Sequence, residues 1–245
     1  MVSVNEAAPH HVRLELLGGF SLAVGDTRVT VPPASERLLA FVAVSCRGAV
    51  PRGLIAGSLW PEAPEHCAYA NLRSVLARLR GTGRTALEIS PSTVRLAAGV
   101  SVDFHRCRAL AARVLDSHAH APHHRPRFGA HTVLQLSADL LPGWYEDWTL
   151  HEAEAWRQMR THALERLAAD FLGARRHPEA VLAAHAAVRA EPLRESSRLA
   201  LIRAHLEEGN TSQARREFER YARRLRAETG AGPPDRLRRL LRERG

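Results

Sequence analysis

The sequence contains no lysine, so all 35 of its basic residues are arginine, set against 26 aspartates and glutamates. The resulting net charge of +9 favours polyanionic partners, among which nucleic acid is the main candidate. A GC-rich genome also tends to encode lysine-free chains, so part of the arginine content could reflect codon usage. Aromatic residues amount to only 5%, so leucine, valine and alanine must fill the cores. A hydrophobic content of 45% argues against a disordered chain, and 245 residues predict one or two domains.

Other features are missing as well. No stretch approaches the roughly 20 apolar residues that span a bilayer, and Met1–Arg13 lack the apolar run of a secretory signal. Cys46, Cys67 and Cys107 are scattered, which predicts reduced thiols rather than disulfides. No phosphate-binding loop, nucleophile elbow or paired-carboxylate motif occurs. We therefore expect a cytoplasmic protein that is not an enzyme, needs no cofactor and makes no membrane contact.

The first hundred residues mix strands and helices. Alternating apolar residues predict strands near 12–16, 20–24 and 29–31, and a hairpin formed by residues 87–89 and 93–96. Between them we expect helices near 35–44, 51–59 and 65–80. The second helix would bury Leu54, Ile55 and Leu59. The third would bury Ala68, Leu72, Val75, Leu76 and Leu79. A sheet, three helices and a hairpin are typical of a winged helix-turn-helix domain, which we place at residues 12–98.

From Asp103 onward the pattern is helical. A loop rich in His and Pro interrupts it at 117–131, and helices are expected near 149–172, 178–190, 195–208, 212–228 and 234–243. Ala180 and Ala214, each near the start of a helix, are 34 residues apart, the period of tetratricopeptide helix pairs. The predicted fold is therefore an α+β N-terminal winged helix-turn-helix domain followed by an all-α tetratricopeptide-like domain at 103–245.

The third predicted helix carries the residues with the most suggestive chemistry. Asn71, Ser74 and Arg78 share its outer face at spacings i, i+3 and i+7, where they would meet base edges in a major groove. Arg78 suits guanine, Asn71 suits adenine, and Ser74 could reach either a base or a phosphate. Phosphate contacts, in the groove or from the hairpin that forms the wing, are expected from Arg73, Arg80, Arg84 and Arg95. The alternative is a solvated helix face whose arginines only keep the domain soluble.

Three further groups each allow two interpretations. The histidines of the loop could bind a metal, but a loop punctuated by prolines supplies fixed geometry poorly, so we expect no metal site; they are His118, His120, His123, His124 and His131. Four aromatic residues could line a ligand pocket, or more simply pack between helices; they are Trp144, Tyr145, Trp148 and Trp156. The arginines of 236–244 could touch DNA or an acidic polymerase surface, or could simply be solvated.

Several separated motifs resemble one family. They are Leu16–Phe20, Val24–Asp26, Arg37–Ala40, Leu59–Pro64, Ala70–Arg80, Leu141–Trp148, Glu191–Glu195 and Leu201–Asn210. Over about residues 12–243 the chain resembles the Streptomyces antibiotic regulatory proteins (the SARP family). In these proteins a winged helix of the response-regulator (phosphorelay) type is joined to a bacterial transcriptional activator domain. Two departures are Cys107, where a large apolar residue is expected, and a wing at 93–96 that lacks an aromatic residue.

The resemblance implies a transcriptional activator of an antibiotic biosynthetic gene cluster. Such a protein would bind direct repeats in double-stranded promoter DNA as a homodimer and recruit RNA polymerase. Ser74 and Arg78 match base-facing positions of related recognition helices, and Arg80 matches a backbone contact. A competing hypothesis is a tetratricopeptide-like module that binds proteins or senses a ligand without specific DNA binding.

Overall fold

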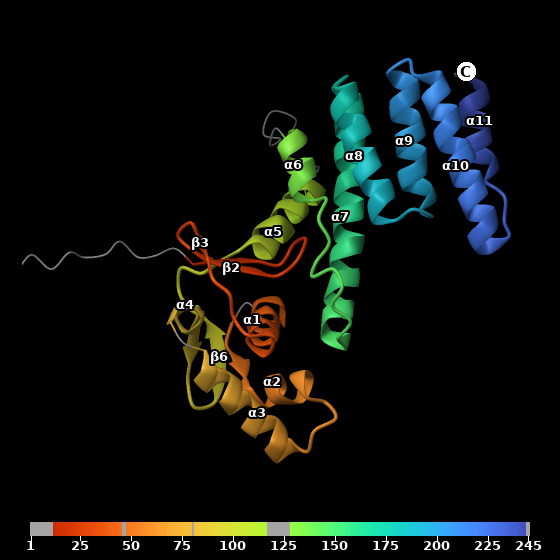
Figure 1. The fold of residues 1–245 in the computed structure, drawn as a ribbon. Coiled ribbons are helices and arrows are strands. Elements are labelled where there is room, and N and C mark those ends of the chain that lie inside the picture. Colours follow the sequence, from red (N-terminus) through yellow and green to blue (C-terminus); the bar gives the residue numbers. More distant parts are fainter. Residues whose placement is uncertain (1–11, 46–47, 80, 117–127, 244–245) are drawn as a thin grey trace, which may run out of the picture. The chain divides into compact units, whose positions relative to one another are not determined.

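The computed structural model describes residues 12–45, 48–79, 81–116 and 128–243. The chain divides into two compact units (Figure 1). The first contains the residues up to Arg106 together with Leu140–Ala153, and the second contains Cys107–Asp139 and Glu154–Gly245. None of the helices in the described part of the chain is long and apolar enough to cross a membrane.

The first unit contains a four-stranded sheet of order β3-β2-β1-β7. Its strands are β1 (Val12–Glu15), β2 (Ser21–Val24), β3 (Thr27–Arg28) and β7 (Ser101–Val102). Only β1 and β7 run parallel; Leu14 and Leu22 face each other across β1 and β2 and are buried. The predicted strand at 29–31 is wrong, because pairing resumes at Thr27 directly after the turn at Gly25. Pro32 and Pro33 then lack the N–H groups that a longer strand would need.

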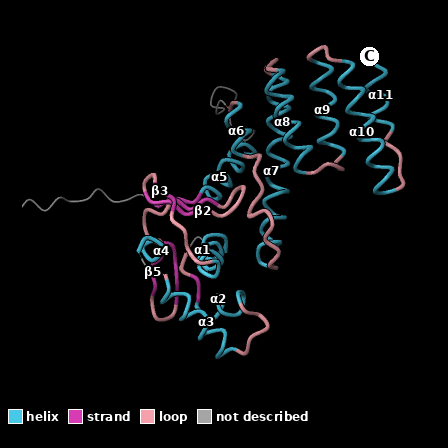
Figure 2. The backbone as a smooth tube through the Cα atoms, viewed as in Figure 1, coloured by secondary structure: helices cyan, strands magenta, loops and turns pink. Residues whose placement is uncertain are grey.

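Three helices and a second sheet complete most of this unit. The helices are α1 (Pro33–Ser45), α2 (Arg52–Leu59) and α3 (Glu65–Arg78), followed by the short α4 (Gly81–Thr85). The second sheet has the order β4-β6-β5 and contains β4 (Val50–Pro51), β5 (Leu87–Ile89) and β6 (Thr93–Leu96). Figure 2 shows this sheet beside α4. The sequence predicted the three helices and the β5–β6 hairpin but not α4 or β4.

The inward faces of α2 and α3 can be compared with the sequence pattern. All five positions predicted to be buried on the third helix are at most 8% exposed. On α2, Ile55 and Leu59 are buried as predicted, but Leu54 is 51% exposed, so its predicted burial is wrong. The buried stripe of α2 runs through Ile55, Ala56 and Leu59, and a turn of 100° per residue places Leu54 on the far side of that stripe.

A distant segment, Leu140–Ala153, belongs to the first unit. Leu140 forms an antiparallel bridge with Leu17, and the N–H of Leu141 donates to the carbonyl of Leu16 at 2.9 Å. Downstream, the Arg37 Nε of α1 donates to Glu146 Oε1 at 2.8 Å. The segment is therefore fastened both to the first sheet and to α1. The predicted domains, 12–98 and 103–245, are each continuous in sequence, and their limits stay a prediction.

Aromatic packing supports the same attachment. Trp148 meets Phe41 edge-on with ring centroids 5.2 Å apart, and Trp144 stacks on Phe20 at 6.3 Å. Tyr145 is 80% exposed, whereas Trp156 is buried in the second unit. The four aromatic residues singled out in the sequence therefore do not form one cluster.

Asp103, the first residue of α5 (Asp103–Asp116), fixes the end of β1. Its carboxylate accepts N–H groups from Leu16 at 2.8 Å, Leu17 at 3.1 Å and Phe104 at 2.6 Å. Burial raises the pKa of Asp103 even though these three N–H groups favour the ionised form. The start of α5 is thereby tied to the sheet of the first unit.

The second unit is helical. Besides the rest of α5 it contains α6 (Ala130–Gln135), most of α7 (Asp147–Gly173), α8 (His177–Ala190), α9 (Glu195–Glu207), α10 (Thr211–Thr229) and α11 (Asp235–Glu243). Helix α9 packs against both α8 and α10, and α10 packs against α11 (Figure 1). Five of the six buried residues of α8 are alanines, whose small side chains allow this close packing; they are Ala180, Ala183, Ala184, Ala186 and Ala187.

The 34-residue offset seen in the sequence recurs in the helix boundaries. Helices α7 and α9 end at Gly173 and Glu207, and α8 and α10 begin at His177 and Thr211. Each pair of positions is separated by 34 residues, and Ala180 and Ala214, the residues that suggested the offset, are both fully buried.

The turns between these helices are equivalent as well. The N–H of Arg176 donates to the carbonyl of Phe171 at 2.8 Å, and the N–H of Asn210 donates to the carbonyl of His205 at the same distance. The residue before each donor has a positive φ, 57° at Arg175 and 86° at Gly209. The same helix–turn–helix geometry is therefore built twice from different side chains.

Candidate nucleic-acid interface

The outer face of α3 combines three polar side chains. Asn71 and Arg78 are exposed and Ser74 is half-buried, while Leu72 and Leu76 on the other side of the helix are buried. Seven residues make about two helical turns, so Asn71 and Arg78 lie on one side with Ser74 between them. The structure thus presents the three predicted base-facing residues on one accessible face.

The arginines of α3 are open to a partner. The side chains of Arg73 and Arg78 are exposed, and neither makes a hydrogen bond or an ion pair with any residue that the structure describes. An arginine without an intramolecular partner keeps its planar set of N–H donors available for a phosphate or a guanine edge. Arg80 lies outside the described residues.

Helices α1 and α2 support this face from behind. A Cβ atom on Gly53 of α2 would lie 2.8 Å from Tyr69 Oη of α3, so only glycine allows the observed approach unless Tyr69 moves. At the end of α2, the carbonyl of Leu59 accepts a hydrogen bond from Arg37 Nη2 at 3.1 Å. These contacts fix the position of α3 within the first unit.

The other two predicted phosphate contacts, Arg95 and Arg84, already bond to residues of the β5–β6 hairpin. Arg95 Nε donates to Glu88 Oε2 at 2.7 Å, and this pairing lowers the pKa of Glu88. Arg84 is exposed, but its Nη1 donates to the carbonyl of Leu87 at 2.9 Å. Both guanidinium groups therefore already have intramolecular partners.

Arg52 is a further candidate phosphate contact that was not predicted from the sequence. Arg52 begins α2, and its backbone N–H donates to the carbonyl of Ser92 in the hairpin turn at 2.9 Å. Its Nη1 reaches the carbonyl of Pro91 at 3.4 Å. The cation is thereby placed at the tip of the hairpin, a position that depends on contacts 39 residues apart in the chain and has no local sequence signal.

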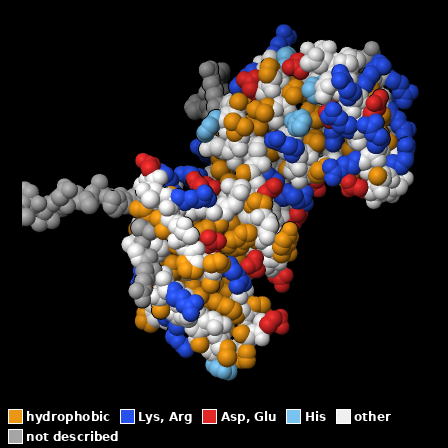
Figure 3. All heavy atoms as spheres, viewed as in Figure 1, with side chains coloured by type: hydrophobic (Ala, Val, Ile, Leu, Met, Phe, Trp, Pro, Cys, Tyr) orange, Lys and Arg blue, Asp and Glu red, His pale blue; other side chains and the backbone are white. Residues whose placement is uncertain are grey.

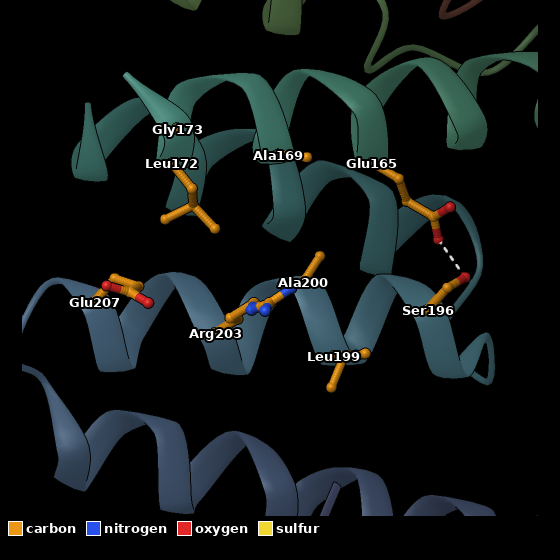
Figure 4. Close-up of a pocket in the computed structure, with 9 residues that line it drawn as sticks. All are labelled: Glu165, Ala169, Leu172, Gly173, Ser196, Leu199, Ala200, Arg203 and Glu207. Carbon is orange, nitrogen blue, oxygen red and sulfur yellow. Dashed lines mark hydrogen bonds between the residues drawn. The ribbon is translucent and has the colours of Figure 1, made fainter. Parts of the chain in front are cut away.

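The second unit contains a separate pocket of about 430 Å³ between α7 and α9. Figure 4 shows Glu165 and Ser196 at one end, Arg203 and Glu207 toward the other, and small or apolar residues between them. Glu165 is held by the hydroxyl of Ser196 at 2.6 Å and by Arg194 Nε at 2.9 Å. The pocket thus has an ion-paired glutamate fixed at one end and small or apolar residues in the middle.

No metal centre is formed by the residues that the structure describes, since no three His, Cys, Asp or Glu side chains gather. His118, His120, His123 and His124 lie outside the described residues. His131 belongs to α6, which begins at Ala130.

Comparison with known proteins identifies the class of the chain. The family model of the bacterial transcriptional activator domain matches residues 102–243. The chain therefore belongs to the bacterial transcriptional activator domain family, as the resemblance to the SARP proteins implied.

A solved structure has a similar fold. The structure of Mycobacterium tuberculosis EmbR in complex with a low affinity phosphopeptide is similar with a TM-score of 0.65 and 21% sequence identity, over 96% of this chain. This chain spans 65% of the length of that EmbR chain. No curated protein matches the sequence significantly.

Proposed function

We propose that the chain is a sequence-specific DNA-binding transcriptional activator of the SARP type. In this proposal the first unit works as a winged helix-turn-helix with α3 as its recognition helix, and α7–α11 form a tetratricopeptide-like stack. The observation that carries the proposal is the accessible row of Asn71, Ser74 and Arg78 on a helix whose opposite face is buried.

In the proposed complex, α3 lies in a major groove, which is wide enough for an α-helix. Arg78 would bind guanine O6 and N7 through two N–H groups, Asn71 would bind adenine, and Ser74 would reach a base or a phosphate. Arg73 and Arg80 would contact phosphates beside them. Phosphates would have to share Arg95 with Glu88 and Arg84 with the Leu87 carbonyl, so we assign both a smaller contribution.

The remaining features follow the family resemblance. We propose that the protein binds direct repeats in promoter DNA as a homodimer, recruits RNA polymerase and controls an antibiotic biosynthetic cluster. We also propose that it works in the cytoplasm, without enzymatic activity or a cofactor. The bacterial transcriptional activator domain at 102–243 supports a role in activation.

The test begins with footprinting the protein on the DNA that flanks its own gene, where repeats about one helical turn apart are expected. Replacing Arg78 with alanine should then weaken binding to the protected site by about 1–3 kcal/mol and relax base choice at one position. Arg113→Ala, which removes an exposed arginine of α5, is the matched control. Unchanged affinity and base choice for the Arg78 variant in a gel-shift titration would show that α3 is not the reading helix.

The pocket between α7 and α9 favours a second candidate function, a tetratricopeptide-like module that binds a protein or a small ligand. The same titration separates the two functions. A parent protein that shifts no DNA at low salt, yet binds a peptide or small molecule tightly, would replace the first proposal with the second.

A further inference from the structure

The net positive charge of the second half comes from its last 36 residues, which hold α10 and α11. From Asp103 to Gly209 the sequence has 14 arginines and 14 acidic residues, so this stretch is formally neutral. From Asn210 to Gly245 it has 11 arginines and five acidic residues, a formal excess of six. A general preference for arginine does not explain why acidic partners are scarce only here.

Ion pairing shows the same contrast. Earlier in the second unit, Arg157, Arg166 and Arg194 each pair with a carboxylate. On α10 and α11, Arg220, Arg224 and Arg238 pair with carboxylates. The side chains of six other exposed arginines make no hydrogen bond or ion pair with a residue in the described ranges. These are Arg215, Arg223, Arg226, Arg236, Arg239 and Arg242. We name this set the α10–α11 basic surface, and Figure 3 shows arginines gathered over these two helices.

Helical geometry places these cations on the solvent side. Arg215 and Arg226 are separated by 11 residues, about three turns, so they lie on one side of α10, opposite buried Tyr221. On α11, Leu237 is buried and the three arginines recur at every third residue. The surface is thus a row of unpaired guanidinium groups along two packed helices.

The chemistry of this surface favours one partner. None of the exposed large hydrophobic residues in the described part of the chain lies on α10 or α11, so a protein partner would find no apolar anchor there. Tyr221 is buried, so no tyrosine of α10 is available for stacking single-stranded bases. The backbone of duplex DNA requires neither, because its phosphates bind arginine directly.

We propose that the α10–α11 basic surface binds the phosphate backbone of duplex DNA without reading its sequence. The inference rests on the proposed function for its ligand, but its residues belong to the other unit and are separate from α3. The surface raises affinity for promoter and random DNA alike, and leaves base choice to α3.

The test uses the full chain with Arg223→Gln and Arg226→Gln combined. The matched control combines Arg113→Gln with Arg189→Gln, which removes the same charge from exposed arginines of α5 and α8. Affinity for the footprinted duplex and for a random duplex is measured by fluorescence anisotropy over a range of salt concentrations, after circular dichroism has verified folding. We expect the slope of log affinity against log salt to fall by up to about 1.8 on both duplexes, because each phosphate that an arginine neutralises adds about 0.9 to it. The control should keep the parent slope.

A parent-like slope in the α10–α11 variant on both duplexes would overturn the inference. So would an unchanged DNA slope accompanied by weaker binding to polyglutamate, because the surface would then serve an acidic protein. The Arg78→Ala result is independent of this one. A reduced salt slope in the α10–α11 variant, with Arg78→Ala still choosing bases normally, would reject the reading helix and keep the basic surface.

Discussion

At the residue scale, the two equivalent turns differ in backbone strain. Gly209 adopts a φ of 86° without penalty, whereas Arg175 holds a φ of 57° despite its Cβ atom. Left-handed backbone costs a non-glycine residue roughly 1–2 kcal/mol, and glycine costs roughly 0.5–1 kcal/mol through the greater entropy of the unfolded chain.

We expect Arg175→Gly to stabilise the protein by about 0.5 kcal/mol, the difference between these two effects. The reciprocal change, Gly209→Ala, should cost a similar amount, about 0.5 kcal/mol, because it introduces the strain at the second turn and removes the entropic cost of glycine. Urea unfolding followed by circular dichroism measures both. A destabilised Arg175→Gly variant would mean that this side chain, and not the turn, matters at this position.

At the element scale, a buried ion pair joins α9 to α10. Arg198 Nη1 lies 2.7 Å from Glu217 Oε2, with the two side chains 7% and 3% exposed. Burial lowers the pKa of Arg198, and Glu217 opposes this shift. The guanidinium also lies over the ring of Tyr221 at 5.5 Å. The pair therefore sets the register between two helices of the repeat.

We expect Glu217→Ala to destabilise the protein by about 3–5 kcal/mol, because it leaves a buried arginine without its partner. The double variant Arg198→Met with Glu217→Leu should recover most of that stability. Arg224→Ala, which breaks the exposed pair with Glu228, serves as the control and should cost less than about 1 kcal/mol. If thermal and urea unfolding show equal destabilisation for Glu217→Ala and Arg224→Ala, the buried pair has no special role.

The elements themselves were largely predictable. The main helices, from α1 to α3 and from α7 to α11, begin and end within two residues of their predicted limits, because proline and glycine mark the ends. Strands β4 and β7 have two residues each, too few for any periodicity, and they form only because distant strands accept them. Leu54 shows why apolar residues alone do not define the buried face of a short helix. Which face of α2 is buried depends on the elements that pack against it.

Some features of the candidate site could also be predicted from the sequence, and others could not. The face of Asn71, Ser74 and Arg78 followed from helical spacing alone. The pairing of Arg95 with Glu88 could have been found from the hairpin, because the two residues are cross-strand partners. Arg52 at the hairpin tip and the attachment of Leu140–Ala153 depend on tertiary contacts that no local pattern encodes.

At the scale of the whole molecule, the first unit is discontinuous in sequence. The predicted domain at 12–98 lacks both Asp103, which accepts three backbone N–H groups, and Trp148, which packs on Phe41. We expect an isolated 12–98 fragment to be less stable than the same residues in the full chain, by at least about 3 kcal/mol for the missing aromatic packing alone.

Thermal melting of the fragment, followed by circular dichroism, checks this expectation against a full-length protein with Trp148→Ala. The full-length variant should lose part of the same stability while keeping the rest of the segment in place. A fragment that melts cooperatively at the temperature of the parent would show that residues 12–98 are sufficient on their own.

The discontinuity of the first unit also affects when that unit can be completed during translation. A ribosome adds about 5–20 residues per second, so the 47 residues between Arg106 and Ala153 take roughly 2–10 s to synthesise. During that interval the nascent chain holds α1–α3 but not the strand bridge, the tryptophans or Glu146 that complete their unit. A chain released early by a premature stop would carry the arginines of α3 on an unfinished scaffold. If the first unit binds DNA as proposed, it would be complete for that role only late in translation, after more than half of the polypeptide has been made.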